Sequence, residues 1–310
     1  MRKIYYALSW LPVILVFVYL SHYYMRLYPI SLAFKDQPND IPVVVYHGIE
    51  KNTKKEHYLT GEDFINQLKY FKKNNYTPIT IREYISILNG KSSFPKKPIV
   101  LTFHDNHYGQ YRYAFKYLKE YDFKASFFVV AKWTKDNNIK WAMSWDEIKK
   151  INSYKNIDGN KLFDIEAHSL AHAALTRKKG ETLIMFEKRM VPEIRDTRLI
   201  IGEKIGTSPK VFALPGGANG PGWEDKSEYK IILKLLKKYQ YTGLQTGHYF
   251  TKNNWSISGI SVHNIGLKDL ELEFILNRGK QTNYLLDYLK WLLTVANRSF
   301  VKFKIGLGIY

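Results

Sequence analysis

Two short stretches hold the side chains that are best suited to catalytic chemistry. The apolar run 99–103 is followed directly by His104 and Asp105. Further along the chain, His168 and His172 stand four positions apart, and this spacing predicts that both imidazoles lie on one side of a helical turn. A carboxylate with two imidazoles is a three-ligand set for a transition metal that leaves one coordination position open for water. We therefore expect Asp105, His168 and His172 to converge.

A metal bound in this way predicts a hydrolase. Two neutral imidazoles and one carboxylate leave a divalent metal with a net positive charge. That charge acidifies a bound water and polarises a substrate carbonyl oxygen. Hydrolysis of an amide or an ester needs both effects, together with an acid that protonates the leaving group. Paired histidines alone are common on protein surfaces, so the prediction depends on the aspartate and on where the fold places both motifs.

Apolar, β-branched segments alternate with helical periods from Ile41 onward. The predicted strands cover residues 41–47, 76–81, 99–103, 125–130, 163–167, 210–214, 241–246 and 257–262. Helices are predicted around 64–71 behind a cap at Thr60, over 110–121, after the capping box 144–147, over 180–205 with an interruption at Pro192, and over 226–239. This α/β alternation implies a mainly parallel sheet, either barrel or doubly wound, and the number of strands favours a barrel. Ligand groups in such folds lie at the carboxyl ends of strands, where Asp105 and His168 are both found.

The composition excludes several classes of site. The chain has 310 residues, of which 45% are hydrophobic, so it can bury a substantial core. It contains no cysteine, which excludes disulfides, thiolate metal ligands and cysteine nucleophiles. Lys and Arg number 47 against 28 Asp and Glu, for a net charge of +19 that attracts polyanions. Because the basic residues are spread along most of the chain, we expect a diffuse field and no nucleic-acid partner.

The N-terminus is predicted to be a membrane anchor. Ile4–Met25 contains no charged residue and is long enough as a helix to span about 30 Å, the thickness of a hydrocarbon core. Arg2 and Lys3 precede it and favour a cytoplasmic N-terminus. The alternatives are a cleaved signal peptide, although no small-x-small cleavage site follows closely, and a buried core helix. With a transmembrane helix at 1–25 and a linker at 26–40, the rest of the chain lies on the extracytoplasmic face, in the periplasm or at the cell surface.

The C-terminal tail, residues 281–310, reads as an amphipathic helix followed by a basic apolar stretch. Two interpretations fit this pattern. The helix packs against the domain that precedes it, or it lies on a membrane surface.

Five motifs in order resemble the polysaccharide deacetylases of carbohydrate esterase family 4. They are Pro42–Gly48, Thr102–Asn106, Ala125–Phe128, His168–His172 and Leu214–Gly217. The resemblance covers about residues 41–265 and is greatest to the branch that acts on poly-β-1,6-N-acetylglucosamine in biofilms. It implies a distorted (β/α) barrel over residues 41–280 and a polysaccharide N-deacetylase of the cell envelope. It also implies that Asp105, His168 and His172 bind Zn²⁺ or another divalent transition metal.

One departure from the family pattern concerns the general base. Where the family has the first aspartate of an Asp-Asp pair, this chain has His104. A neutral histidine can accept a proton, but a nearby cation disfavours imidazolium, so His104 should be a poorer base than a carboxylate. The late arginine strand of the family is replaced by Ser258–Ile260. For the general acid of this branch, a histidine, His248 and His263 are both candidates, and their spacing does not choose between them.

Other residues are predicted to contact substrate. His47, Pro215 and Trp223 are the candidates for binding an N-acetylglucosamine polysaccharide, and His107 either lines the pocket or lies in an exposed turn. Tryptophans at 133, 141, 145 and 223 form either a platform for sugar rings or part of the core. The glycines of 215–222 lack the Gly-Lys-Ser/Thr ending of a phosphate-binding loop, so nucleotide binding is not expected.

Three functions follow from this pattern. The leading prediction is a metal-dependent N-deacetylase of a poly-N-acetylglucosamine exopolysaccharide. The alternative is a catalytically degenerate protein of the same fold that binds glycan, because His104 replaces the expected aspartate. A third possibility is a peptidoglycan deacetylase. The sequence does not indicate the oligomeric state.

Overall fold

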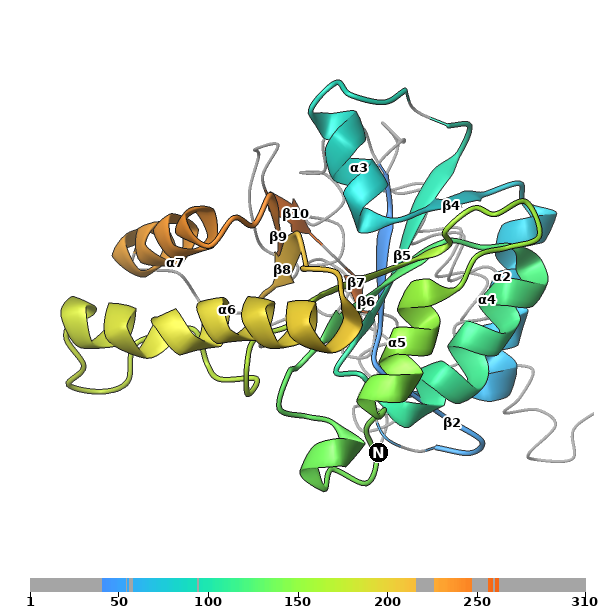
Figure 1. Cartoon of the computed structure of the whole chain (residues 1–310). Helices are drawn as coiled ribbons and strands as arrows, with labels where there is room; N and C mark the ends of the chain where they lie inside the picture. The colour runs from blue at the N-terminus through green and yellow to red at the C-terminus, as the bar shows by residue number, and fades with distance from the viewer. Residues whose placement is uncertain are drawn as a thin grey trace, which may run out of the picture.

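The fold is described by a computed structural model that covers most of the predicted domain (Figure 1). The described residues are 41–53, 55, 58–93, 95–215, 226–246, 256–258 and 260–261. The predicted anchor, linker and C-terminal tail lie outside them, as do His248, His263 and Trp223. None of the described helices is long and apolar enough to cross a membrane.

A nine-stranded parallel sheet forms the centre of the domain. Its strands are β1 (Val43–Tyr46), β4 (Thr77–Ile79), β5 (Pro98–His104), β6 (Ala125–Val129), β7 (Phe163–Ala167), β8 (Val211–Ala213), β9 (Gly243–Thr246), β10 (Ser256–Ser258) and β11 (Ile260–Ser261). They run in the order β10-β9-β8-β7-β6-β5-β1-β11, with β4 also paired to β5. Each predicted strand is present within a few residues of its expected bounds. The last one is divided between β10 and β11.

The sheet curls toward a barrel. Strands β10 and β11 stand at opposite ends of the strand order, yet only one residue separates them in the chain. Two residues of chain reach at most about 7 Å, so the two edges of the sheet meet where β10 passes into β11. Among the described strands the two edges are joined by the chain but not by strand pairing, so the prediction of a barrel-like α/β sheet is confirmed as a curled, incompletely closed sheet of parallel strands.

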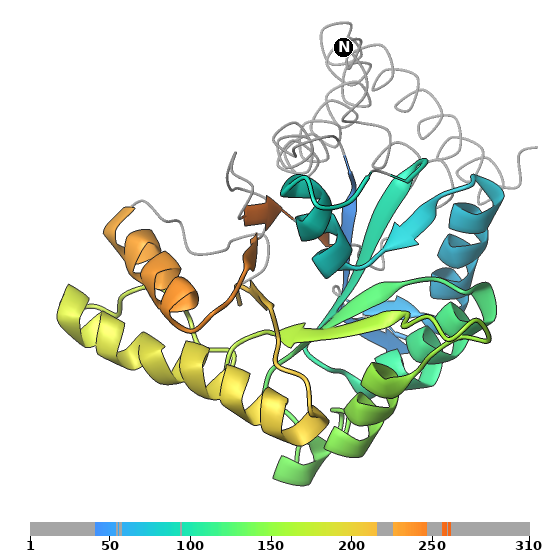
Figure 2. The same ribbon diagram turned by 45° about the horizontal axis from the view of Figure 1, so that its top comes forward.

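Helices cover both sides of this curled sheet (Figure 2). Figure 2 shows α3 (Ile81–Leu88) inside the curl, and α2 (Gly61–Lys73), α4 (Lys116–Tyr121), α5 (Trp145–Ser153) and α6 (Leu183–Ile205) along its outer side. The remaining α-helix of the described chain, α7 (Lys226–Lys238), packs on α6. Residues of α3 form a buried cluster with Val43, Val100, Phe128 and Val211 on the inner face of the sheet. The inner face is therefore closed beneath the carboxyl ends of the strands, where the predicted site residues lie.

Capping explains where several helices begin. The Thr60 hydroxyl accepts from the Asp63 amide at 3.1 Å, as predicted for α2. Ser144 and Glu147 form the predicted capping box of α5. A second capping box, formed by Thr80 and Glu83, begins α3, a helix that was not predicted from the sequence.

The predicted interruption at Pro192 is wrong, because α6 continues through this residue. A proline inside a helix removes one hydrogen bond and costs about 3 kcal/mol. Phe186, Met190, Ile194 and Ile201 lie on the buried face of α6. Burial of each such side chain contributes about 1.5–3 kcal/mol, which outweighs the lost bond.

A second, smaller sheet was also not anticipated. Strands β2 (Gly48–Glu50) and β3 (Tyr58–Thr60) pair in parallel as a separate two-stranded sheet. The helix predicted over 110–121 is present, and its first part is a π-helix, η2 (Gln110–Phe115), that leads into α4. From it, the Gln110 side-chain amide donates to the carbonyl oxygens of His47, at 2.9 Å, and of His104. This side chain therefore ties the ends of β1 and β5 together beside the predicted site.

Candidate metal centre

The structure brings the three predicted metal ligands together. Asp105 Oδ1 lies 3.3 Å from His168 Nε2 and 3.5 Å from His172 Nε2. The three ligand atoms all lie within 4.8 Å of one another. Asp105 follows β5 and His168 follows β7, so the site is at the carboxyl ends of the strands, as expected for this type of sheet.

A turn with positive backbone angles presents Asp105. Its φ is 68°, and that of Asn106 is 41°. Asp and Asn tolerate this left-handed region better than most residues, so the turn forms without glycine. The Asn106 side chain then holds the turn in place. Its Oδ1 accepts from the Val130 amide at 2.9 Å, and its Nδ2 donates to the carbonyl of Trp133.

The two histidines do not lie on a helical turn, so that part of the prediction is wrong. Residues 168–172 form a loop, in which Ser169 has φ 67° and His172 has φ 56°. The Ser169 hydroxyl accepts from the His172 amide at 2.9 Å. Glu193 of α6 accepts from the amides of Leu170 and Ala171 at 3.0 and 3.1 Å. These side chains satisfy the amide groups that a helix would otherwise pair, and they bring the two rings to a centroid distance of 5.0 Å.

A backbone contact orients His168 toward the centre. His168 Nδ1 lies 3.0 Å from the carbonyl oxygen of Ala213 on β8. Because a carbonyl can only accept, Nδ1 carries the proton and Nε2 presents its lone pair to the side where Asp105 and His172 lie. A ring nitrogen that donates to a carbonyl while the other faces a metal is the usual arrangement of a metal-binding histidine.

The charges at the centre fit a metal ion. Asp105 Oδ1 is buried and has no hydrogen-bond partner, although it faces two imidazoles. Burial alone would raise the pKa of Asp105, but the adjacent imidazoles of His168, His47 and His172 outweigh it and hold that pKa well below its usual range. Burial, and then the charge of His168, lower the pKa of His172 to about 4. Asp105 is thus anionic and His172 neutral near neutral pH, the forms that bind metal.

His104 lies beside the three ligands and outside their group. The residue is 7% exposed, and its ring contacts those of His168, at a centroid distance of 4.6 Å, and Phe128, at 4.9 Å. Its Nε2 is buried without a hydrogen-bond partner. Burial, and then the charges of His168 and His47, lower the pKa of His104 well below its ordinary value. His104 is therefore a neutral imidazole with a buried, unused nitrogen next to the metal centre.

The other predicted residues fall into two groups. His47 lies at the end of β1, with its ring 5.6 Å from that of His104, and Pro215 is buried just after β8. His107 is also buried and contacts Tyr58 and Trp141, so it does not lie in an exposed turn. His248, His263 and Trp223 lie outside the described residues, so their roles stay predictions.

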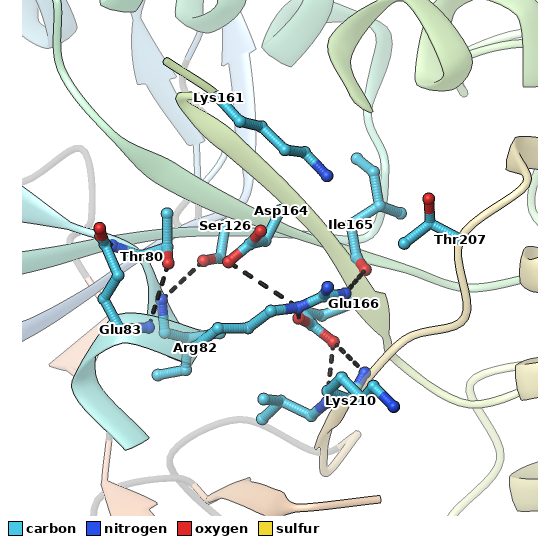
Figure 3. Close-up of polar contacts among 12 residues, drawn as sticks. Thr80, Arg82, Glu83, Ser126, Lys161, Asp164, Ile165, Glu166, Thr207 and Lys210 are labelled. Carbon is cyan, nitrogen blue, oxygen red and sulfur yellow. Dashed lines mark hydrogen bonds and ion pairs between the residues drawn. The ribbon is translucent and has the colours of Figure 1, made fainter. Parts of the chain in front are cut away.

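A buried ion pair just below the centre was missed by the sequence analysis (Figure 3). Glu166 is fully buried two residues before His168, and it pairs with Arg82 of α3. Glu166 Oε2 also accepts from the amides of Lys210 and Val211 at 2.7 and 2.8 Å. Two acidic residues in a strand predicted to be buried, Asp164 and Glu166 of Phe163–Ala167, were the available signal in the sequence.

Comparison with known families gives a match to polysaccharide deacetylases over residues 91–244. Among curated proteins, a putative polysaccharide deacetylase of Bacillus subtilis is 23% identical over 68% of this chain and 65% of its own length. The poly-β-1,6-N-acetyl-D-glucosamine N-deacetylase of Escherichia coli is 21% identical over 66% of this chain. This chain spans only 33% of the length of the Escherichia coli protein.

Solved structures with a similar fold cover most of this chain. A Streptococcus pyogenes deacetylase, determined in complex with acetate, matches 77% of this chain and 99% of its own with a TM-score of 0.62 and 18% identity. A de-N-acetylase from Aggregatibacter actinomycetemcomitans matches 76% of this chain and 99% of its own with a TM-score of 0.61 and 16% identity. IcaB from Ammonifex degensii matches 77% of this chain and 98% of its own with a TM-score of 0.58 and 18% identity. These similarities establish the curled parallel fold.

Proposed function

Because this chain contains a domain of the polysaccharide deacetylase family, we propose that it is a metal-dependent N-deacetylase. Its substrate is an N-acetylglucosamine polysaccharide of the poly-β-1,6-linked type. The observation that carries this proposal is the convergence of Asp105 Oδ1 with the Nε2 atoms of His168 and His172 within 4.8 Å. A carboxylate and two neutral imidazoles suit Zn²⁺ or another divalent transition metal.

In this proposal, different residues of the centre have different roles in amide hydrolysis. Asp105, His168 and His172 would hold the metal, which when bound supplies Lewis-acid chemistry at an amide carbonyl. In this proposal His104 would stand in the general-base position, and its neutral form can accept a proton. The leaving amine needs a proton from a general acid, for which His248 and His263 remain the candidates.

The choice of substrate is supported by the relatives. The Escherichia coli relative is named for poly-β-1,6-N-acetyl-D-glucosamine, and it matches 66% of this chain. We therefore propose the same polymer class here. Peptidoglycan is the competing substrate, and a substrate panel separates the two.

We also propose that the domain works on the extracytoplasmic side of a membrane. The uncharged segment Ile4–Met25, preceded by Arg2 and Lys3, supports an N-terminal anchor. Cell fractionation with protease treatment of intact cells tests this. The domain should be found in the membrane fraction and should be cleaved by a protease that cannot cross the cytoplasmic membrane. Recovery of the protein in the soluble fraction after lysis, or full resistance to that protease, contradicts the proposal.

The decisive experiment measures acetate release and metal content together. The full-length protein is incubated with β-1,6-linked and β-1,4-linked N-acetylglucosamine oligomers and with peptidoglycan, and acetate is assayed enzymatically. We expect release from the β-1,6-linked oligomer, loss of release with a chelator, and recovery on adding Zn²⁺. Elemental analysis should find about one metal per chain. Less than about a tenth of a metal per chain in protein purified without chelators would overturn the proposal.

A second candidate function is glycan binding without hydrolysis. One observation favours it. His104 is buried against Phe128 with its pKa well below the ordinary value, so the protonated form that a general base must reach is strongly disfavoured. This candidate predicts that the protein binds the β-1,6-linked oligomer and holds metal but releases no acetate.

A further inference from the structure

A strip of aromatic side chains leads from the metal centre to the surface. We call it the aromatic strip, and it consists of Tyr58, His107, Tyr108, Trp133 and Trp141. Trp133 stacks on His172, with ring centroids 4.7 Å apart and planes at 20°. Trp141 packs edge-on against Trp133 at 5.5 Å and lies over His107 at 6.0 Å. The strip is thus continuous from a proposed metal ligand to a ring at the surface.

The outer end of the strip is exposed. Trp141 is 43% exposed and Tyr108 is 37% exposed. Among the large hydrophobic side chains exposed in the described part of the chain, these are the two aromatic ones. The others lie elsewhere, on α6 or at Ile157.

The backbone holds these rings in position. His107 and Ala142 form an isolated antiparallel bridge, and the Tyr108 amide donates to the Trp141 carbonyl at 2.8 Å. The Met143 amide donates to the carbonyl of Asn106 at 2.9 Å. Because Asn106 follows Asp105 directly, the segment that carries Trp141 is hydrogen-bonded to the turn that presents a proposed metal ligand. A ligand on the Trp141 ring is therefore held at a fixed distance from the reacting centre.

One lysine lies at the exposed end of the strip. Lys135 Nζ is 5.4 Å from the centroid of the Tyr108 ring, and exposed Lys132 and Lys140 adjoin Trp133 and Trp141 in the chain. Asp136 is the acidic residue of segment 132–141, and Glu50 Oε1 lies 3.8 Å from His107 Nε2 in the buried part of the strip. An ammonium group near Lys135 meets like charge, whereas an uncharged ring does not. Deacetylation converts a neutral N-acetylamino group into an ammonium group, so we expect the exposed end of the strip to favour the N-acetylated form.

We propose that the Trp141 face is a subsite for an uncharged, N-acetylated sugar ring of the polymer, next to the sugar at the metal centre. The proposal rests on the proposed function. The apolar face of a pyranose ring stacks on the indole, whose rigid, amphipathic surface suits a ligand that is apolar on one side and hydrated on the other. The subsite makes the protein prefer polymer over single sugars and acetylated stretches over deacetylated ones.

The test compares three ligands and four proteins by isothermal titration calorimetry, with the metal chelated to prevent turnover. The ligands are the β-1,6-linked N-acetylglucosamine pentasaccharide, its fully deacetylated counterpart and the monosaccharide. The proteins are the wild type, Trp141→Ala, Trp141→Tyr and Leu199→Ala, the last being an exposed control on α6. We expect Trp141→Ala to weaken pentasaccharide binding about tenfold or more. Trp141→Tyr should restore most of it, and Leu199→Ala should leave it unchanged.

The outcomes separate this inference from the proposed function. Unchanged pentasaccharide binding by folded Trp141→Ala, with wild-type acetate release intact, overturns the subsite and leaves the function standing. Equal binding of the acetylated and deacetylated pentasaccharides overturns the charge discrimination. A wild type that neither binds the pentasaccharide nor releases acetate overturns both. Circular dichroism and thermal unfolding of each variant distinguish a lost subsite from a lost fold.

Discussion

The Nδ1 atom of His168 lies 3.0 Å from the carbonyl oxygen of Ala213 on the neighbouring strand. This contact spans a weak junction, because β7 and β8 share a single register pair, Ala167 with Phe212. Two residues before His168, the Glu166 carboxylate accepts the amides of Lys210 and Val211, where β8 begins. Glu166 is therefore a positioning residue: it sets the start of β8, and with it the carbonyl that orients a proposed metal ligand.

The first prediction concerns Glu166→Gln. The substitution leaves Arg82 without its nearest counter-charge and weakens the acceptor for the β8 amides, so we expect a loss of about 2–4 kcal/mol in the free energy of unfolding. Because the orientation of His168 also relaxes, Zn²⁺ affinity should fall by about 10–100-fold. Urea denaturation and chelator competition on the folded variant measure the two effects.

A control for this prediction is Glu187→Gln, which breaks an exposed pair with Lys234 at 2.7 Å. An exposed pair contributes about 0–1 kcal/mol, and this one is remote from the centre. Zn²⁺ affinity in Glu166→Gln equal to that of Glu187→Gln would show that Glu166 contributes only to stability.

The second prediction concerns the proposed ligands. Asp105→Asn and His172→Ala each impair or remove one of the three proposed metal ligands. Loss of a residue that only hydrogen-bonds to a ligand lowers metal affinity by up to about 100-fold, so we expect a larger loss of Zn²⁺ affinity here. His107→Ala is a matched control, since His107 lies close by on the aromatic strip but outside the ligand group. Equal metal content in all three variants, measured by elemental analysis, would contradict the assignment.

The third prediction is that the metal-free protein loses stability as the pH falls from about 7 toward 5. The pKa of His172 is about 4 in the folded protein against an ordinary value of 6.5. Between these values the unfolded chain binds a proton that the folded protein does not, so unfolding becomes easier as the pH falls. The lowered pKa of His104 acts in the same direction.

His172→Gln tests this dependence directly. It removes the titrating group, so the fall in unfolding free energy between pH 7 and pH 5 should be smaller than in the wild type, by about 1–3 kcal/mol. Urea denaturation of chelator-treated protein at the two pH values gives the difference. An identical pH dependence in both proteins would mean that His172 does not lose its proton on folding.

The fourth prediction decides between turnover and binding alone. A carboxylate at position 104 would accept a proton more readily than the buried imidazole, so His104→Asp should raise the rate of acetate release by about 10²-fold or more. If the wild type is active with His104 as its base, His104→Ala should abolish release while leaving metal content unchanged. A silent wild type that His104→Asp activates is a glycan-binding protein.

Most of the fold could be predicted, because strand and helix periods are local properties of the chain. The runs that form β5, β6 and β7 were expected at nearly their observed bounds, and the capping box of α5 was read from its residues. The convergence of Asp105 with His168 also followed from the sequence. In a parallel sheet the carboxyl ends of the strands lie at one edge, so Asp105 after β5 and His168 after β7 lie on the same side of the sheet, with only β6 between their strands.

The conformation of residues 168–172 could not be predicted from spacing, because four-residue spacing fits a loop as well as a helix. The loop is selected by Glu193, which lies far along the chain on α6 and accepts two of its amides. The pairing of Arg82 with Glu166 depends in the same way on α3 lying inside the curled sheet.

By itself, the sequence determined which residue types stand at the strand ends: Asp105, His168 and His172 as possible ligands, and His104 where a carboxylate was expected. Only the tertiary structure decided how they act. Burial and neighbouring charge lower the pKa of His104 and His172, and the Ala213 carbonyl selects which nitrogen of His168 faces the centre. Solvent exclusion and contacts across the sheet depend on segments distant in the chain, so no local pattern of residues contains them.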